Sequence, residues 1–494
     1  MMWTRAVLVV LVAANFASGT VVDVERRTAF TSCLTSSGSG GTIVTPSSST
    51  YDSGRAAFNQ RLSFKPAAIA YPKSPADVQK YVKCAASNKI AVVGRSGGHS
   101  YAAYGVGGQD GALVIDMKNM KSLTVDSSGV AKVQTGNLLG DVAQKLWDNG
   151  KRALPHGTCP YVGSGGHTAF GGYGPFSRVG GLLHDRVTAA EVVLANGTLT
   201  TATATKNADL FWALRGAGAS YGIVTQWTFA TLAAPTTVIG YEINFDDLTV
   251  TSGKLASLLG AWQKLAIAAP KEMAMIGVVG PDGDGGLYLQ FTGDYYGTKS
   301  AFNSVTANWS SALSPGKITA KTYNWYDSLV ATDGPLSTSK PEPKDTFFAK
   351  SLFTKTAVTS SRWTSFSNYL VSKGTKSSTD WFVEIDLYGG VIKSLGADAT
   401  SFAHRDAILS FQLYASSKNY KPPYPSDGIS FVNGMLNALD SNPQAAYVNY
   451  VDPTLTASQW KSQYYGSHYT RLSSIKRAVD PNNVFRFPQS IGLS

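Results

Sequence analysis

The chain has 494 residues, of which 43% are hydrophobic and 15% are charged, and its formal net charge is +11 at pH 7. A chain of this length exceeds what one simple core usually supports, so we expect two domains. The Lys and Arg residues are scattered and form no dense basic run, which argues against a nucleic-acid-binding protein.

The N-terminus has the pattern of a secretory signal peptide, which we place at residues 1–19. A positive charge precedes an apolar run from Ala6 to Ala14, and small residues follow it. The run is too short to span a bilayer. We therefore expect a secreted, extracellular protein with no membrane partner, and the sequons at Asn196 and Asn308 suit that compartment.

Strand and helix patterns alternate along residues 64–235. Strands are predicted at 67–70, 90–93, 113–115, 130–134, 187–194 and 223–229, and helices at 76–86, 139–147 and 208–214. Glycine-rich stretches follow the second strand and the second helix. This organisation predicts one mixed domain with loops available for binding.

The pattern changes between residue 236 and about residue 445, where alternating strands are separated by helices. The clearest are strands at 287–291 and 382–388 and helices at 254–266 and 363–371. Such a pattern is typical of an antiparallel sheet with helices on one face. The tail returns to a single helix predicted over 457–477. Together the two halves predict an α+β fold.

The three cysteines are Cys33, Cys84 and Cys159. In an oxidising compartment two of three would normally pair. We expect a disulfide between Cys33 and Cys84, which lie in ordinary surroundings near the N-terminus. Cys159 precedes a glycine-rich loop, and it is either a buried free thiol or a thiol with a chemical role.

Two glycine-rich loops, 94–100 and 163–167, each lie close to a nucleophilic side chain, His99 and Cys159 respectively. Glycine allows the backbone to approach a ligand closely, and successive N–H groups can bind an anion. Neither loop has the spacing of a dinucleotide fingerprint or a P-loop. Two such loops beside two nucleophiles favour a cofactor site over ordinary turns.

With these motifs the chain resembles the fungal carbohydrate oxidases of the berberine-bridge-enzyme-like group, within the vanillyl-alcohol-oxidase flavoproteins. The gluco- and chito-oligosaccharide oxidases are the relatives it resembles most. The segments that carry the resemblance are Gly97-Gly98-His99-Ser100-Tyr101, His156-Gly157-Thr158-Cys159-Pro160, Gly163-Ser164-Gly165-Gly166-His167, the stretch 207–216 and Asn449-Tyr450-Val451-Asp452.

The resemblance implies a PCMH-type FAD-binding domain and a substrate domain with a large antiparallel sheet flanked by helices. The expected parts are the signal peptide at 1–19, an N-terminal segment at 20–63, the FAD-binding domain at 64–235, the substrate domain at 236–445 and a berberine-bridge-like segment at 446–494 that returns to the FAD domain.

The resemblance also implies a doubly covalent FAD, with His99 bonded to the flavin 8α-methyl carbon and Cys159 to C6. Because a thiolate is the attacking form, His156 either helps to deprotonate Cys159 or is a structural histidine. Further positions that match cofactor contacts are Arg95, Ser96, Gly97, Gly98, Ser100, Tyr101, Val162, Gly163, Gly165, Gly166, His167, Gly172, Gly174, Gly222, Ile223 and Asn449.

The activity implied is oxidation of the C1 hydroxyl of a reducing sugar to a lactone, with molecular oxygen reduced to hydrogen peroxide. Tyr450 matches the base and Asp386 its partner carboxylate. A free tyrosine has a pKa near 10, so the pair can work only if a proton is shared between the two. Val162 matches the position associated with oxygen access. The expected assembly is a monomer.

Five positions match the family's substrate contacts: Tyr101, Phe348, Phe382, Glu384 and Gln412. Three of them depart from the gluco-oligosaccharide pattern. Phe382 stands where an indole is usual, Glu384 replaces a glutamine and Phe348 replaces a tyrosine. An ionised carboxylate accepts hydrogen bonds but cannot donate them, so the sugar and its length stay open.

Three other functions remain as alternatives. One is an oligosaccharide dehydrogenase with an acceptor other than oxygen, and another is a secondary-metabolite oxidase of the same superfamily. The third is a secreted binding protein that has lost turnover. No metal site is expected, because the six histidines are dispersed without ligand spacing.

Overall fold

The computed structural model describes residues 27–245, 249–340 and 342–493. The signal peptide predicted at 1–19 therefore lies outside the described residues. Within the described part of the chain, none of the helices is long and apolar enough to cross a membrane.

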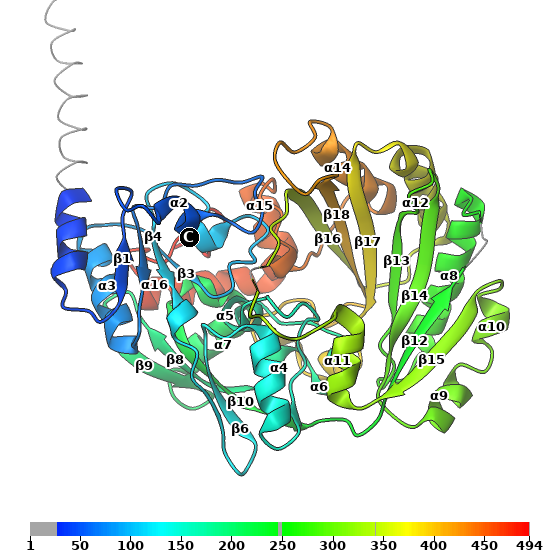
Figure 1. The fold of residues 1–494 in the computed structure, drawn as a ribbon, viewed down its shortest axis with the longest axis horizontal. Helices are drawn as coiled ribbons and strands as arrows, with labels where there is room; N and C mark the ends of the chain where they lie inside the picture. Colours follow the sequence, from blue (N-terminus) through cyan, green and yellow to red (C-terminus); the bar gives the residue numbers. More distant parts are fainter. Residues whose placement is uncertain (1–26, 246–248, 341, 494) are drawn as a thin grey trace, which may run out of the picture.

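Two small sheets lie in the left half of Figure 1. The strands of the first are β1 (Thr42–Val44), β2 (Ala68–Tyr71), β3 (Val92–Arg95) and β4 (Leu113–Asp116). Those of the second are β5 (Leu123–Val125), β6 (Val130–Gln134), β8 (Val187–Val193), β9 (Leu199–Thr203) and β10 (Ile223–Ala230). The first sheet has the order β1-β2-β4-β3, with β2 and β3 parallel to β4, and the second is antiparallel with the order β5-β6-β10-β8-β9.

Helices and loops of this half pack on the two sheets. The helices are α2 (Tyr51–Arg55), α3 (Pro75–Ser87), α4 (Leu139–Asp148), α5 (Ser164–Ala169), α6 (Ser177–Gly180) and α7 (Ala208–Ala217). A capping box between Ser74 and Asp77, with Pro75 at the first helical position, fixes the start of α3. The predicted disulfide between Cys33 and Cys84 is confirmed, and it ties the N-terminal segment to α3.

A seven-stranded antiparallel sheet fills the right half of Figure 1. Its strands are β12 (Val238–Asn244), β13 (Ile276–Pro281), β14 (Leu287–Tyr295), β15 (Lys317–Tyr323), β16 (Phe347–Thr354), β17 (Thr379–Leu387) and β18 (Leu409–Ser417). Their spatial order is β15-β12-β14-β13-β17-β18-β16. The helices of this half are α8 (Ser252–Ala268), α9 (Lys299–Val305), α10 (Trp309–Ala312), α11 (Trp325–Asp333), α12 (Ser360–Lys373), α13 (Val391–Ser394) and α14 (Gly428–Leu439). The predicted α+β fold is thus confirmed.

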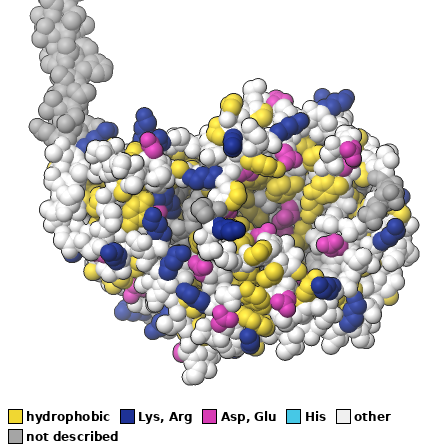
Figure 2. All heavy atoms as spheres, in the orientation of Figure 1, with side chains coloured by type: hydrophobic (Ala, Val, Ile, Leu, Met, Phe, Trp, Pro, Cys, Tyr) yellow, Lys and Arg dark blue, Asp and Glu magenta, His cyan; other side chains and the backbone are white. Residues whose placement is uncertain are grey.

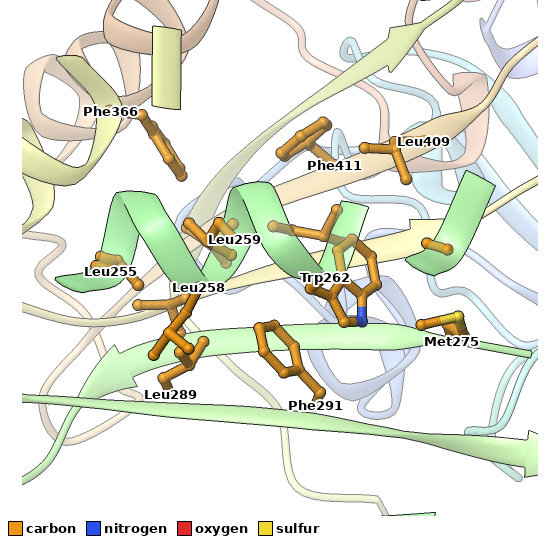
Figure 3. Close-up of a cluster of buried hydrophobic side chains, with 14 of the residues drawn as sticks. Leu255, Leu258, Leu259, Trp262, Met275, Leu289, Phe291, Phe366, Leu409 and Phe411 are labelled. Carbon is orange, nitrogen blue, oxygen red and sulfur yellow. The ribbon is translucent and has the colours of Figure 1, made fainter. Parts of the chain in front are cut away.

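One face of the large sheet packs on α8, α12 and α14 and forms the main hydrophobic core. Figure 3 shows Trp262 of α8 over Phe291 of β14, and the two rings stack with centroids 5.5 Å apart. Because side chains alternate along a strand, the neighbours of core residues point the other way. On β17, Val383 and Ile385 lie in this core, and Glu384 between them faces the opposite side.

The C-terminal segment returns to the first half of the molecule, where α16 (Tyr469–Val479) packs on α7. The single helix predicted over 457–477 is wrong in part. The structure has a short helix, α15 (Ala457–Trp460), then a π turn at 461–465 and a break before α16. Gly466 has φ +50°, a left-handed conformation that ends the first helical run.

A buried asparagine joins the two halves of the molecule. The Asn59 side-chain amide donates to the carbonyl oxygens of Tyr101, at 2.8 Å, and Phe347, at 3.0 Å. Its own carbonyl accepts the Phe347 N–H at 3.2 Å. The Asn59 side chain is completely buried, so one residue of the N-terminal segment hydrogen bonds to both the glycine-rich loop and β16.

Candidate active site

A cavity of about 680 Å³ lies between the glycine-rich loops and the large sheet. Its size is in the range typical of cofactor and ligand sites. Figure 2 shows hydrophobic and acidic side chains gathered over the sheet in this region. The cavity brings together His99, Cys159 and Tyr450, which come from three distant parts of the sequence.

The loop after β3 is held by the side chains of Arg95 and Ser96, which also belong to the cavity lining. The Arg95 guanidinium pairs with Asp116 at 2.6 Å and donates to the Gly54 carbonyl at 2.8 Å. The Ser96 hydroxyl donates to the Thr135 carbonyl at 2.5 Å and accepts the Gly165 N–H at 3.1 Å. Both residues therefore fix the course of the backbone.

The two glycine-rich loops touch each other through their backbones. A Cβ atom on Gly97 would overlap the backbone of Gly163, and a Cβ on Gly163 would overlap that of Gly97. Gly166, in contrast, lies on the cavity wall and has no atom within 4 Å of its Cβ direction. Glycine is needed at the first two positions for close approach, and at the third it leaves the cavity open.

His99 and Cys159 face each other across a carboxylate, Glu342. The His99 Nε2 atom lies 2.7 Å from one Glu342 oxygen, and the Cys159 Sγ atom lies 3.9 Å from the other. Burial raises the pKa of the Cys159 thiol to about 11 and Glu342 adds to the rise, although the N–H groups of Tyr161 and Val162 lower it. Cys159 forms no disulfide in this structure.

His99, Cys159 and Glu342 together form a group that could ligate a metal ion, because their ligand atoms all lie within 4.8 Å of one another. It is the single such group among the described residues. The spacing of histidines in the sequence gave no sign of it, because its members are contributed by three separate loops.

The structure favours a structural role for His156. Its Nδ1–H donates to the Gly157 carbonyl at 2.7 Å, and burial lowers its pKa. His167 accepts the Gly157 N–H on Nε2 at 2.9 Å, and burial lowers its pKa to about 3. Both imidazoles are therefore neutral and hold the segment before Cys159, while Glu342 rather than His156 contacts the thiol.

Most of the expected cofactor positions line the cavity. They are Arg95, Ser96, Gly97, Gly98, His99, Ser100, Tyr101, Cys159, Val162, Gly163, Gly166, His167 and Asn449. Five others do not line it: Gly165, Gly172, Gly174, Gly222 and Ile223. They serve close packing next to the wall, as Ile223 does against Gly94 and Gly222 does against β8.

Tyr447 organises the segment before the expected base. Its hydroxyl oxygen accepts the N–H groups of Gly172 and Tyr173 at 3.1 and 3.2 Å, and the Asn449 amide at 2.9 Å. Its ring meets that of Tyr450 edge-on, with centroids 5.1 Å apart. Tyr447 was not singled out from the sequence, where it is one of 24 tyrosines.

Tyr450 stacks on Tyr101, with centroids 5.6 Å apart and planes 11° from parallel. The Tyr101 hydroxyl accepts the Gln412 amide at 2.6 Å. The Tyr450 hydroxyl makes no hydrogen bond with any described residue, so the expected bond to Asp386 is not formed in this structure. Burial, with Glu384 and Asp386 nearby, raises the pKa of Tyr450 well above its usual value.

Two carboxylates of β17 lie near Tyr450. Burial raises the pKa of Glu384 to about 7. Burial and the charge of Glu384 raise the pKa of Asp386 well above its ordinary range. Asp386 is 3% exposed, and one of its oxygens has no hydrogen-bond partner among the described residues. A buried, unpaired carboxyl oxygen of this kind is suited to holding or passing on a proton.

The cavity side of the large sheet carries aromatic and polar side chains. Phe382 stacks on Tyr414 with centroids 4.9 Å apart, and Gln412 lies opposite Glu384 in the strand register. Tyr288 and Tyr420 are 40% and 49% exposed and line the same cavity. Neither of these two was singled out from the sequence.

Phe348 lies in the core and outside the cavity wall, although it was expected to contact substrate. It is 1% exposed and belongs to the main hydrophobic core, with Arg61 above its ring. The preceding residue, Phe347, points to the cavity side and stacks on Tyr414. Phe347 is itself fully buried and does not line the cavity, so neither residue supplies the expected substrate contact in this structure. A shift of one position along a strand reverses the face, and Phe348 lies on the core face.

Two family models match separate segments of the chain. Residues 66–203 match a family model described as an FAD binding domain, and residues 446–492 match one described as berberine and berberine like. The xylooligosaccharide oxidase of Thermothelomyces thermophilus is 38% identical over 88% of both chains. An FAD-linked oxidoreductase of Metarhizium anisopliae is 34% identical over 95% of this chain and 92% of its own.

Solved structures agree with these relatives. A chitooligosaccharide oxidase superposes with a TM-score of 0.88 at 34% identity, over 94% of this chain and all (100%) of that chain. The glucooligosaccharide oxidase of Acremonium strictum, described as carrying 6-S-cysteinyl, 8α-N1-histidyl FAD, has a TM-score of 0.87 at 30% identity, over 94% of this chain and 99% of that chain.

Proposed function

The chain belongs to the berberine-bridge-enzyme-like family of FAD-binding oligosaccharide oxidases, and on that premise we propose that it oxidises the C1 hydroxyl of a reducing oligosaccharide to a lactone, with oxygen as the final acceptor. The observation that carries this proposal is the meeting of His99, Cys159 and Tyr450 on one cavity whose other wall is the large sheet.

The residues present fit FAD. Gly97 and Gly163 bring two loops into backbone contact, Gly98 has φ +80° and Gly166 faces open space. Such loops expose backbone N–H groups to a phosphate or a ring edge. The residues that would hold FAD are the thirteen that line the cavity, with His99 and Cys159 as the two covalent attachments. When bound, FAD supplies the acceptor for the hydride of the sugar C1 carbon.

Tyr450 is the residue we assign to the C1 hydroxyl proton. Its hydroxyl is unpaired, its ring is fixed between Tyr101 and Tyr447, and two carboxylates lie close by. With a pKa well above 10 the phenol is neutral, so it accepts a proton only as it passes its own onward. Asp386, buried and incompletely hydrogen bonded, is the acceptor we assign to that second proton.

The sheet wall suits a saccharide. Of the three large hydrophobic side chains that are most exposed among the described residues, Tyr288 and Tyr420 line the cavity, and Tyr rings present flat faces to sugars. Gln412 and Glu384 stand side by side as hydrogen-bonding groups. The cavity reaches the surface, as an oligosaccharide requires, and Val162 lines it on the loop side.

The test has two parts. The purified protein is acid-precipitated, and flavin is sought on the peptides that contain His99 and Cys159. The native protein is then assayed for hydrogen peroxide with cellobiose, xylobiose and chitobiose. We expect flavin in the pellet and peroxide from at least one sugar. A colourless protein would overturn the proposal. A flavoprotein that is inert toward every sugar would keep the family assignment but exclude these sugars as its substrates.

A second candidate function is oxidation of a non-sugar alcohol, which the similarity to the Metarhizium anisopliae oxidoreductase favours. The same screen with benzylic and allylic alcohols separates the two functions. Faster turnover of such alcohols than of any disaccharide would favour the second candidate. An excess of ferricyanide in place of oxygen likewise tests whether the enzyme is a dehydrogenase.

A further inference from the structure

Glu342 lies in the loop between α11 and β16, far in sequence from either expected attachment residue. Its carboxylate accepts a hydrogen bond from His99 Nε2 at 2.7 Å and lies 3.9 Å from Cys159 Sγ. The Phe58 ring stacks on the His99 imidazole, with centroids 4.4 Å apart and planes at 19°. Two different contacts therefore set both the plane and the rotation of this imidazole.

The contact also determines which ring nitrogen of His99 is free. The carboxylate oxygen accepts in this contact, so the tautomer of His99 that makes the hydrogen bond carries its hydrogen on Nε2. Nδ1 then carries the lone pair, and it makes no hydrogen bond with any described residue. The imidazole is thus held as a nucleophile through Nδ1, with a base already at its other nitrogen.

We propose that Glu342 is the base for covalent attachment of FAD to His99, taking the Nε2 proton as Nδ1 bonds to the 8α carbon. This inference rests on the proposed attachment to His99 and not on the sugar reaction. The net change balances: one hydrogen leaves the cofactor methyl group, one leaves the imidazole, and molecular oxygen accepts both as hydrogen peroxide.

Cys159 should respond to Glu342 in the opposite way. The negative charge of Glu342 adds to the rise in the thiol pKa, so this carboxylate disfavours the thiolate. The nucleophilic form of cysteine is the thiolate. Removing the charge should therefore impair attachment at His99 while leaving attachment at Cys159 intact or faster. A residue needed only for folding would impair both.

The experiment compares full-length protein secreted by a riboflavin-starved host, with FAD added in air. Flavin on the His99 and Cys159 peptides is followed over time by mass spectrometry. Glu342→Gln keeps the shape and an acceptor oxygen but cannot take the proton. We expect attachment at His99 to slow about 100-fold, as for loss of a general base, with no slowing at Cys159. Glu342→Asp should restore part of the rate.

Asp333→Asn is the matched control, because Asp333 also raises the Cys159 pKa and does not contact His99. It should leave the His99 rate unchanged. A wild-type rate at His99 in Glu342→Gln would overturn the proposal. Equal loss at both peptides would also overturn it, since Glu342 would then act on folding. A wild-type protein with no flavin at His99 would overturn the proposed attachment itself.

Discussion

The two walls of the cavity are constructed differently. On the loop wall, backbone meets backbone: Gly97 and Gly163 leave no room for a Cβ atom, and Ser96 ties one loop to the other. On the sheet wall, the cavity is lined by side chains that alternate along the strand with core residues, as Glu384 does between Val383 and Ile385.

This difference determines what a substitution can change. A side chain added at Gly97 or Gly163 must move the main chain, which affects folding and cofactor binding together. A side chain exchanged on the sheet wall leaves the core face of the strand in place. We therefore expect substitutions on the loop wall to change stability and flavin content. Substitutions on the sheet wall should change the KM for the substrate and the pH dependence of kcat/KM.

The largest expected effect is at Tyr450, which lies between the walls. Tyr450→Phe keeps the ring stacked on Tyr101 and removes the group that takes the proton, so kcat should fall about 1,000-fold, within the usual range for general-base catalysis. Stopped-flow measurement of flavin reduction by sugar tests this. Tyr388→Phe is the control, because the buried Tyr388 hydroxyl has no partner and lies off the cavity wall. An unimpaired Tyr450→Phe enzyme would remove the assigned base.

Next in size is the contrast between two glycines of one loop. Gly163→Ala should destabilise the protein by about 2 kcal/mol or more, because overpacking against backbone cannot relax cheaply. Gly166→Ala should leave the free energy of unfolding nearly unchanged, since its Cβ would enter open space. Denaturant unfolding of both variants measures the difference. Equal stability would mean that the loops are not in rigid backbone contact.

Much of the fold and part of the site could be predicted from the sequence. The strand at 130–134 is confirmed without change, because its residues have a strong local strand pattern. The disulfide between Cys33 and Cys84 is also confirmed, because the chain has only three cysteines and two of them lie in ordinary surroundings near the N-terminus. His99 and Cys159 line the cavity, as their glycine-rich surroundings predicted.

Other features could not be predicted, for physical reasons. Glu342 has no local motif, since its role comes from contacts with residues far away in the chain. Phe348 was assigned to the wrong face because β16 is buried along its whole length, so no alternation of polar and apolar residues reveals its register. The break at Gly466 interrupts a stretch whose residues otherwise suit a helix.

A smaller effect is expected from the carboxylate pair of the sheet wall. Asp386 must be ionised to take a proton, so kcat/KM should fall as pH drops below the pKa values of the pair. Glu384 raises the pKa of Asp386, and Glu384→Gln should therefore move this acidic limb to lower pH. A pH profile of kcat/KM tests the shift. Asp380→Asn, on the same strand and bound to the Tyr420 hydroxyl, should leave the limb in place.

The smallest expected effect is at the mouth of the cavity. Tyr420→Ala should raise KM for a disaccharide about fivefold, which corresponds to about 1 kcal/mol of lost ring contact, with kcat unchanged. Ile267→Ala is the control, because Ile267 is similarly exposed at 47% but lies away from the cavity. The same KM in both variants would mean that the sugar does not reach Tyr420.

The buried Asn59 side chain has a consequence for how a substrate can enter the cavity. Three of its hydrogen bonds join the glycine-rich loop to β16. Separating the two halves of the molecule would leave the buried amide unpaired and cost about 1–3 kcal/mol for each unpaired group. This cost disfavours enclosing a long polymer between separated halves and favours entry through the open end of the cavity. On the proposed function, the reducing end of the sugar would enter, and the lactone would leave, through the same opening of the cavity.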